Sequence, residues 1–185
     1  MSRLMWVLLA GCGLAMAVAP ASAQEIFCTV VGAKQGTFQD VRGGGSNASQ
    51  IPVLFVTEEI SVSFDTATGR STGNRTHTPV TIVKELDATS PHFFQAAVNN
   101  ETLNTVTCTF YRGFRNGTGA GGGATRPYFR ITLTNATIVD YKDAGDGTNG
   151  TAAGDERERI SLTYQRIELT DLDSNVTALD DWQAG

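Results

Sequence analysis

Few side chains in this chain of 185 residues have a setting suited to acid–base or nucleophilic chemistry. Its two histidines are His77, in a polar segment, and His92, in a short apolar stretch. Neither has a serine or cysteine beside it in a recognisable nucleophile setting, so structural or surface roles are favoured over catalysis. We therefore predict that the chain has no catalytic residue, needs no cofactor and is not an enzyme.

Metal sites and phosphate-binding loops are also not predicted. Asp143, Asp146, Asn149 and Asp155 lie close together in one loop, which would suit calcium, but their spacing departs from the EF-hand pattern. A solvated turn is the better interpretation. A glycine-rich run from Gly113 lacks the lysine and Ser/Thr ending of a phosphate loop, and no C-x-x-C or Cys/His spacing typical of zinc occurs.

The first residues have the pattern of a secretory leader. A basic start with Arg3 precedes an uncharged run from Leu4 to Val18, and a small-residue A-x-A site ends at Ala23, just before Gln24. We predict a signal peptide over residues 1–23, a single domain over residues 24–185 and a periplasmic or extracellular location. The alternative is a lipoprotein attached through Cys12, which ends a lipobox-like LAGC sequence after a very short apolar run.

Composition limits the partners of the exported chain. The full sequence carries 14 basic and 19 acidic residues, a formal net charge of −5, and removing the leader with Arg3 lowers the net charge to −6. The sequence has no cluster of lysines and arginines. Nucleic acids and anionic membranes are therefore disfavoured as partners. After the leader, no segment approaches the roughly 20 apolar residues of a membrane span.

Cys28 and Cys108 are the two cysteines left after the leader is removed. Each alternates with apolar residues along a predicted strand, so both are expected to face the core. An even pair in an oxidising compartment is consistent with a disulfide, and two small buried apolar side chains are equally consistent with the pattern. Both interpretations stand at this point.

The rest of the sequence is dominated by β-strand patterns. β-branched and aromatic residues with period-two alternation predict strands over residues 25–31, 51–64, 80–86, 103–112, 127–142 and 158–170. The apolar parity changes near Gln165, which predicts a bend there. Residues 65–79 are expected to form an extended polar loop, and residues 171–185 a flexible acidic tail.

One short helix interrupts the strands. Ser90 is a suitable N-cap and Pro91 fits the first helical turn, where a missing amide hydrogen costs no helical bond. The apolar residues at helical spacing, listed here, predict the buried face: Phe93, Phe94, Ala97 and Val98. The Asn99-Asn100 pair is a plausible left-handed stop.

The order of these pieces resembles the Hcp family, the tube proteins of bacterial type VI secretion systems. The matching residues, in chain order, are Arg75, His77, Pro79, Ile82, Lys84, Glu85, Ser90, Pro91, Phe94, Gln95, Ala96, Asn99, Asn100, Phe110, Tyr111 and Arg112. The strands that begin at Ile131 and Glu158 look like the last two long strands of the family, and the strand from Glu25 looks like its first.

The resemblance implies an all-β fold with one short helix, a curled two-sheet β-barrel of the Hcp type. It implies a homohexameric ring that can stack into a tube and act as a non-catalytic conduit or effector carrier, with effector or spike proteins as further partners. Arg75, His77, Pro79, Lys84 and Glu85 would then lie at subunit contacts. The helix and its core contacts would include, from the same resemblance, Ser90, Pro91, Phe94, Gln95 and Ala97.

One feature departs from the family. Its tube subunits assemble in the cytoplasm and leave through the secretion machine, whereas a leader over residues 1–23 would direct this chain through the general export pathway. The alternative hypothesis is therefore a secreted Hcp-like binding or surface protein that does not work in a secretion tube.

Overall fold

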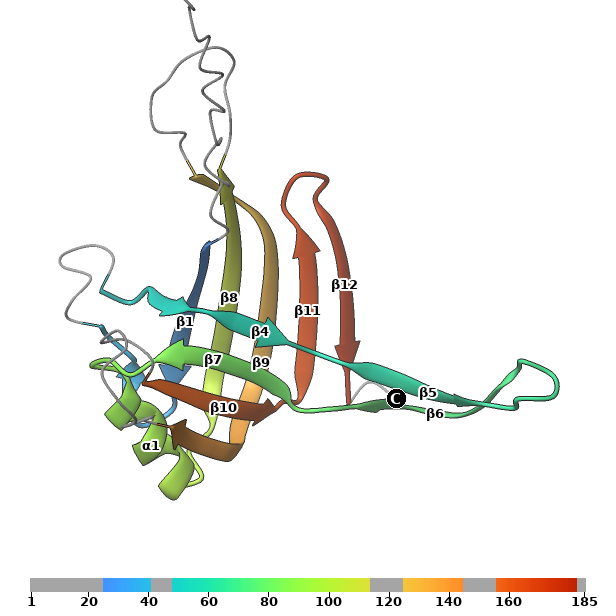
Figure 1. The fold of residues 1–185 in the computed structure, drawn as a ribbon, viewed down its shortest axis with the longest axis horizontal. Coiled ribbons are helices and arrows are strands. Elements are labelled where there is room, and N and C mark those ends of the chain that lie inside the picture. The colour runs from blue at the N-terminus through green and yellow to red at the C-terminus, as the bar shows by residue number, and fades with distance from the viewer. Residues whose placement is uncertain (1–24, 41–47, 114–124, 145–155, 183–185) are drawn as a thin grey trace, which may run out of the picture.

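The computed structural model describes residues 25–40, 48–113, 125–144 and 156–182 (Figure 1). The predicted leader with its cleavage site at Ala23 and Gln24, the lipobox cysteine Cys12 and most of the acidic loop after Asp143 lie outside these residues. The described part is mostly β-strand, in two sheets, with one short helix, which confirms the predicted fold class.

The described residues form twelve strands and one helix. In chain order they are β1 (Glu25–Gly32), β2 (Gly36–Thr37), β3 (Ile51–Val53), β4 (Phe55–Thr57), β5 (Ile60–Phe64), β6 (Ser71–His77), β7 (Val80–Glu85), α1 (Ser90–Val98), β8 (Leu103–Gly113), β9 (Thr125–Ala144), β10 (Arg157–Thr163), β11 (Arg166–Asp171) and β12 (Val176–Asp181). The predicted strand over residues 51–64 is thus three shorter strands, because Leu54 and the Glu58–Glu59 pair interrupt it.

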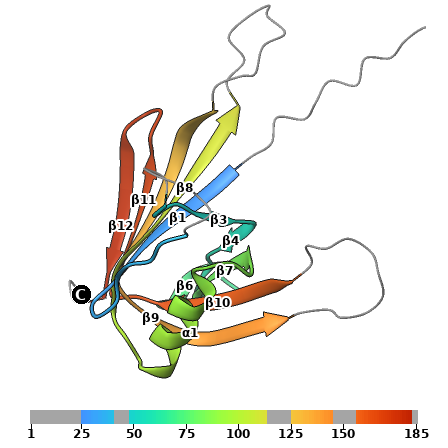
Figure 2. The same cartoon turned by 90° about the vertical axis from the view of Figure 1, so that its left-hand side faces the viewer.

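The long strand β9 joins two groups of strands. Its first part pairs with β8 and β11, and its second part pairs with β10, which continues to β7 and β4. Asn135, with a φ of 50°, lies where β9 passes from one group to the other. Figure 2 shows β9 curving between the two groups, with β10 and β7 on one side and β8, β11 and β12 on the other.

The predicted bend near Gln165 is confirmed, and it divides the expected last strand into β10 and β11. The two bends lie against each other. The side-chain amide of Asn135 donates to Gln165 Oε1 at 2.7 Å, and the Gln165 backbone N–H donates to the Thr134 carbonyl at 3.1 Å. A sheet curled in this way turns one face of both strand groups toward a common interior.

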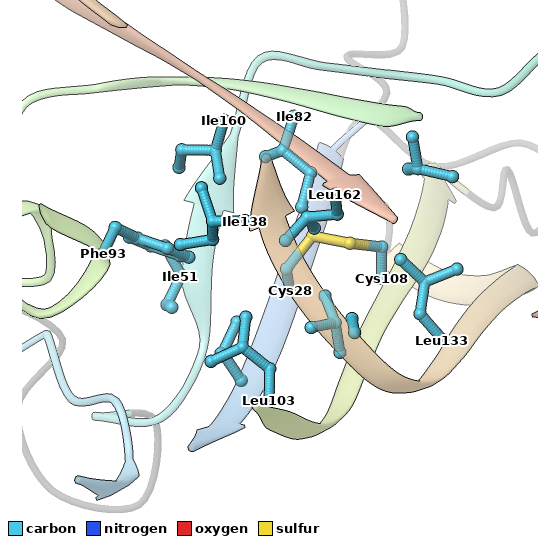
Figure 3. Packing of buried hydrophobic residues seen from close by; sticks show 14 of the residues in the cluster. Cys28, Ile51, Ile82, Phe93, Leu103, Cys108, Leu133, Ile138, Ile160 and Leu162 are labelled. Atoms are coloured by element: carbon cyan, nitrogen blue, oxygen red, sulfur yellow. A yellow bond between two sulfur atoms is a disulfide. The ribbon is translucent and has the colours of Figure 1, made fainter. Parts of the chain in front are cut away.

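That interior is filled mainly by aliphatic side chains, part of which Figure 3 shows, with the rings of Phe38 and Phe93. Ile82 and Ile160 come from one strand group and Leu133 from the other, and each is at most 1% exposed. β1 and β8 pair with Cys28 opposite Cys108, and the structure holds a disulfide between these two residues. Burying each large aliphatic side chain contributes about 1.5–3 kcal/mol, so this cluster supplies most of the favourable free energy of folding.

The helix begins at Ser90 and has a proline in its first turn, as predicted, but its buried face differs from the prediction. Phe93 and Ala96 are each 1% exposed, whereas Phe94 is 55% and Val98 61% exposed. Gln95 is also exposed and Ala97 is partly buried, so Phe94 and Gln95 do not belong to the core. The reason is that α1 is oriented through buried Ser90, which puts the residues three and six positions later on the inner side.

The N-cap of the helix differs from the prediction, whereas its C-terminal end agrees with it. The N-cap is Thr89, not Ser90, because the Ser90 hydroxyl accepts instead from the Asp87 backbone N–H at 3.0 Å. At the other end Asn100 has a φ of 48° and the Glu101 N–H donates to the Ala96 carbonyl, consistent with the predicted left-handed stop.

The predicted flexible tail is wrong for most of its length. Val176–Asp181 form β12, which pairs with β11 along its whole length. The turn between them uses the acidic residues: Asp171 Oδ1 accepts from the backbone N–H groups of Asp173 and Ser174, and Asn175 adopts a φ of 55°. The acidic residues that predicted a solvated tail therefore include one that closes the turn of a hairpin.

Candidate assembly surface

Within the segment predicted as a polar loop, residues 65–79, the structure has the strand β6, which pairs with β5 in a two-stranded ribbon that we call the arm. Its strands pair only with each other, and Figure 1 shows the arm running out from the rest of the fold. Ile60 lies opposite His77 at its root and Phe64 opposite Ser71 near its tip. The loop prediction failed because the β5 pattern stops at Phe64 and the polar β6 sequence has no apolar alternation of its own.

The tip of the arm is a tight turn. The Asp65 N–H donates to the Arg70 carbonyl, the Gly69 N–H donates to the Asp65 carbonyl, and Asp65 Oδ1 accepts from the Ala67 N–H at 2.7 Å. Gly69 has a φ of 67°, in the left-handed region that glycine adopts without strain. The hydrogen bond from the Ala67 backbone N–H lowers the pKa of Asp65, so its carboxylate stays charged at the end of the arm.

The arm exposes large apolar side chains along one strand. Ile60, Val62 and Phe64 are 48%, 46% and 63% exposed and, two residues apart, share one face of β5. An isolated two-stranded ribbon is marginally stable in water, and contiguous exposed apolar surface marks an interaction site. The arm therefore has the properties of a segment that another protein surface covers.

At the root of the arm, Arg75 and His77 both meet Asp180 of β12. The Arg75 guanidinium forms two hydrogen bonds of 2.5 Å to the two carboxylate oxygens. His77 Nε2 lies 2.7 Å from Asp180 Oδ2, at ion-pair distance although not aligned as a hydrogen bond. The hydrogen bond from Arg75, followed by the charges of Arg75 and His77, lowers the pKa of Asp180 despite some desolvation.

Three more groups surround His77. Its Nδ1 lies 2.8 Å from the Tyr164 hydroxyl, and its ring packs against Trp182 with centroids 5.1 Å apart. Burial, with the charges of Glu58 and Asp180, raises the pKa of Tyr164 to about 12, so this hydroxyl is protonated at neutral pH. Burial also raises the pKa of Glu58, although the charge of His77 opposes that shift.

A cavity of about 390 Å³ opens beside the root of the arm. It is lined by Thr57, Glu58, Glu59, Thr78, Pro79, Thr81 and Ser161. Its side-chain chemistry is hydroxyl and carboxylate, and Glu58 Oε2 is buried there without a hydrogen-bond partner among the described residues. The lining has no nucleophile paired with a base.

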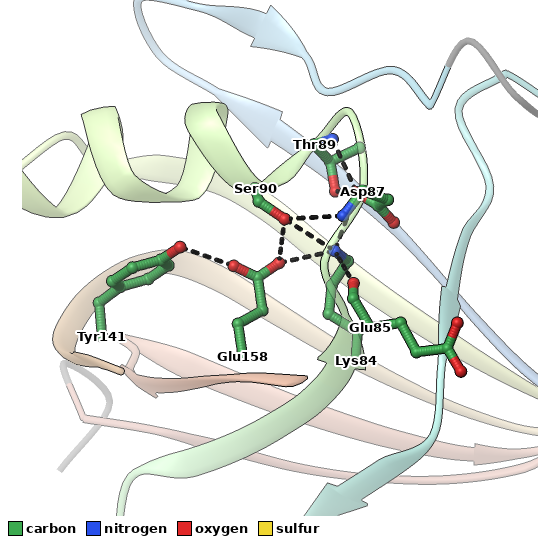
Figure 4. Close-up of polar contacts among 7 residues, drawn as sticks. All are labelled: Lys84, Glu85, Asp87, Thr89, Ser90, Tyr141 and Glu158. Atoms are coloured by element: carbon green, nitrogen blue, oxygen red, sulfur yellow. Dashed lines mark hydrogen bonds and ion pairs between the residues drawn. The ribbon is translucent and has the colours of Figure 1, made fainter. Parts of the chain in front are cut away.

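Lys84, predicted at a subunit contact, is completely buried within the protomer, so that assignment is wrong. Its ammonium lies 2.6 Å from Glu158 Oε1 and 2.9 Å from Asp87 Oδ1, and donates to the Glu85 carbonyl at 2.7 Å (Figure 4). The Ser90 hydroxyl completes the group, at 2.9 Å from Glu158 Oε1. Glu85, on the opposite side of the strand, is exposed as expected.

The Lys84 cluster joins three elements, β7, β10 and the start of α1. Tyr141 of β9 donates to Glu158 Oε2 at 2.8 Å, and burial together with this carboxylate raises the pKa of Tyr141. Burial by itself raises the pKa of Asp87, but hydrogen bonds from Thr89 and Lys84 have the larger combined effect and lower that pKa. Sequence reasoning missed Glu158 and Asp87, since nothing local indicates that either carboxylate is buried.

The predicted residues therefore separate into two places. Arg75, His77 and Pro79 lie at the root of the arm, while Lys84, Ser90 and Pro91 belong to the helix attachment. His92 packs flat on Phe38 with centroids 5.2 Å apart, and its Nδ1 lies 2.9 Å from Gln35 Oε1, a structural setting. Within the described ranges there is no group of three metal-ligating side chains and no helix long and apolar enough to cross a membrane.

Comparison with known proteins gives a consistent result. Residues 38–170 match the protein family described as type VI secretion system effector, Hcp. The major exported protein of Pseudomonas aeruginosa is 28% identical over 173 residues, which cover 88% of this chain and 97% of that protein.

Solved structures agree on the fold. The chain is similar to an Hcp protein with a TM-score of 0.75 at 21% identity, over 88% of this chain and 100% of the other. It is similar to a variant Hcp protein of the E. coli EAEC 042 pathovar with a TM-score of 0.71 at 23% identity, over 86% and 99%. A secreted Hcp protein from Pseudomonas aeruginosa gives 0.63 at 27% identity, over 85% and 99%.

Proposed function

Because this chain belongs to the Hcp family of type VI secretion proteins, we propose that it forms a homohexameric ring in which the arm of one subunit packs on a neighbouring subunit. The family is structural: its members form hexameric rings and tubes that act as conduits or effector carriers. The function of this chain is accordingly that of a tube-forming protein of a type VI secretion system.

The observation that carries the assembly proposal is the arm itself. Its apolar side chains Ile60, Val62 and Phe64 are about half exposed or more, and β5 and β6 form a sheet of their own. Covering this ribbon with a neighbouring copy removes apolar surface from water and gives it packing partners. Pro79, exposed at the root of the arm, and Glu85, exposed at the other end of β7, are further residues for subunit contacts.

Assembly is tested on residues 24–185 by size exclusion with light scattering and by negative-stain imaging. We expect hexameric rings for the unaltered protein and a shift to smaller species for Phe64→Ser on the arm. Phe94→Ser is the matched control, because Phe94 is a similarly exposed phenylalanine on the helix. A monomeric unaltered protein, or equal effects of the two substitutions, would refute the assembly through the arm.

We also propose that residues 1–23 are a leader and that the working protein begins at Gln24. The solved Hcp structures are matched over 99–100% of their length while covering 85–88% of this chain, so this chain is longer than they are. That difference supports an added segment, and export agrees with the relative named as a major exported protein.

The leader favours the second candidate function, a secreted Hcp-like protein that binds or coats a surface outside a secretion tube. Mass spectrometry of the intact protein isolated from cells separates the two. A mass that corresponds to a chain beginning at Gln24 supports export through the leader and the second candidate function. A mass that includes residues 1–23 rejects the leader and supports cytoplasmic assembly of a tube.

A further inference from the structure

The direction of the arm relative to the rest of the fold is not determined by the sheet hydrogen bonds of the arm. β5 follows β4 after Glu58 and Glu59, and β6 leads to β7 through Thr78 and Pro79. The Thr78 N–H donates to the Glu59 carbonyl at 3.0 Å, which ties the two connections to each other. A two-residue connection on each strand leaves the ribbon free to change its angle unless side chains hold it.

We propose that Asp180, at the end of β12, clamps the root of the arm and so holds the arm in the direction that assembly requires. This inference rests on the proposed packing of the arm against a neighbouring subunit. Asp180 acts as a positioning residue, and the partner for which it positions the arm is a second copy of this chain.

The geometry of Asp180 suits a clamp. Arg75 and His77 are two residues apart and therefore share one face of β6, and both point to the same carboxylate. Arg75 binds both carboxylate oxygens, and such a bidentate pair fixes orientation as well as distance. The arm is thus held by two contacts to one side chain of a strand 105 residues away in sequence.

The end of β12 is itself held in place. The backbone N–H of Trp182 donates to the Gln165 carbonyl at 3.0 Å, at the bend between β10 and β11. The Trp182 ring packs against His77, and Tyr164 from the same bend contacts the other ring nitrogen of His77. Asp180 lies opposite Ile167, a core residue that is 1% exposed, so its backbone pairs with a strand that is anchored in the core.

The same contacts show why Arg75 and His77 act within the subunit. The His77 side chain is 2% exposed and cannot itself reach a neighbouring copy. The Arg75 side chain is 54% exposed, and the two oxygens of Asp180 occupy the Nε–Nη2 edge of its guanidinium. Replacing His77 would therefore weaken assembly by releasing the arm, not by removing a bond between subunits.

The test measures arm direction and assembly separately. Paired spin labels on Thr68 at the arm tip and on Lys142 of β9 report their distance distribution in the full mature chain. Asp180→Ala and Asp180→Asn are compared with the control Asp173→Ala. The control removes an aspartate that also pairs with arginines, Arg112 and Arg126, but lies at the far end of the same hairpin. Urea unfolding checks that each variant keeps the core.

We expect both Asp180 variants to broaden the distance distribution and to raise the concentration for half-assembly at least tenfold, while Asp173→Ala changes neither. The swapped pair Arg75→Asp with Asp180→Arg should narrow the distribution again. An unchanged distribution in Asp180→Ala overturns the clamp. A broadened distribution with normal rings overturns its role in assembly. If the unaltered chain is monomeric, the proposed function fails, and the distance distribution still decides whether the clamp exists.

Discussion

At the scale of single residues, burial decides what a charged side chain does in this protein. Lys84 and Glu85 are neighbours in sequence, yet one is completely buried and the other exposed. Lys84 is surrounded by Glu158, Asp87 and a backbone carbonyl, so its charge is compensated inside the fold. Breaking a buried ion pair by removing one partner is costly, because the other charge stays in a medium that solvates it poorly.

We expect Lys84→Met to destabilise the folded chain by about 3–5 kcal/mol, because it leaves the buried carboxylates Glu158 and Asp87 without their cation. The measurement is urea unfolding of residues 24–185 at neutral pH. Lys142→Met, at an exposed position of β9, is the control and should change the free energy of unfolding by less than about 0.5 kcal/mol. Equal effects would contradict the structural role of the Lys84 cluster.

Unlike the paired charges around Lys84, the charge of Glu58 destabilises the fold, to an extent that depends on pH. Its pKa in the folded chain is raised above the ordinary value of 4.5, mainly by burial, so ionising it destabilises the fold as the pH rises above that value. Glu58→Gln should therefore be more stable than the unaltered protein at neutral pH, by under about 1 kcal/mol because water still screens the site.

The gain from Glu58→Gln should shrink as the pH falls and vanish below about pH 4, where the carboxyl group of the unaltered protein is itself protonated. Urea unfolding at several pH values between about 4 and 7 measures this trend. Glu59→Gln, an exposed neighbour, changes the same charge and serves as the control. A gain that does not depend on pH would reject the assignment to the buried carboxylate.

At the scale of elements, the helix shows how attachment selects a buried face. The apolar residues of α1 allow more than one face, and the Ser90 contacts with Glu158 and Asp87 select the one that carries Phe93 and Ala96. Phe94 instead lies on the surface with its ring edge against Tyr141, at a centroid distance of 5.8 Å.

We expect Phe93→Ala to lower the free energy of unfolding by about 3–5 kcal/mol, because it leaves a cavity in the core. Phe94→Ala should cost under about 1 kcal/mol, since it removes an exposed ring and one aromatic contact. The two variants are compared by thermal and urea unfolding. Similar losses in both would mean that the helix presents a different face to the sheet.

At the scale of the whole molecule, the chain closes on itself through long-range contacts. The Cys28–Cys108 disulfide joins β1 to β8 across a sequence separation of 80 residues, and β12 returns the end of the described chain to the root of the arm. A link of that span restricts the unfolded chain strongly, while the folded strands already lie side by side.

We expect reduction of the disulfide, or replacement of both cysteines by alanine, to lower the free energy of unfolding by roughly 2–4.5 kcal/mol. Urea unfolding with and without a reductant measures the loss in residues 24–185, which contain no other cysteine. The double alanine variant provides the control, since a reductant should leave its unfolding unchanged. A protein whose unfolding is insensitive to reductant would show that the link does not form in solution.

Local patterns in the sequence determined the elements of this protein. Alternation of apolar residues indicated strands at β1, β8 and β9, and Ser90, Pro91 and Asn100 marked the helix. The parity change located the bend at Gln165, and the order of these pieces indicated the Hcp family. These signals could be interpreted because propensity and periodicity depend on residues a few positions apart.

Only the tertiary structure decided which side chains meet. The burial of Lys84, the exposure of Phe94, the pairing of β12 with β11 and the contact of Arg75 with Asp180 all depend on segments distant in sequence. Apolar alternation did not indicate the polar strand β6, and the composition of β12 suggested a solvated tail. The physical reason is that burial and pairing are set by the sum of contacts in the folded chain, and no local window of the sequence contains that sum.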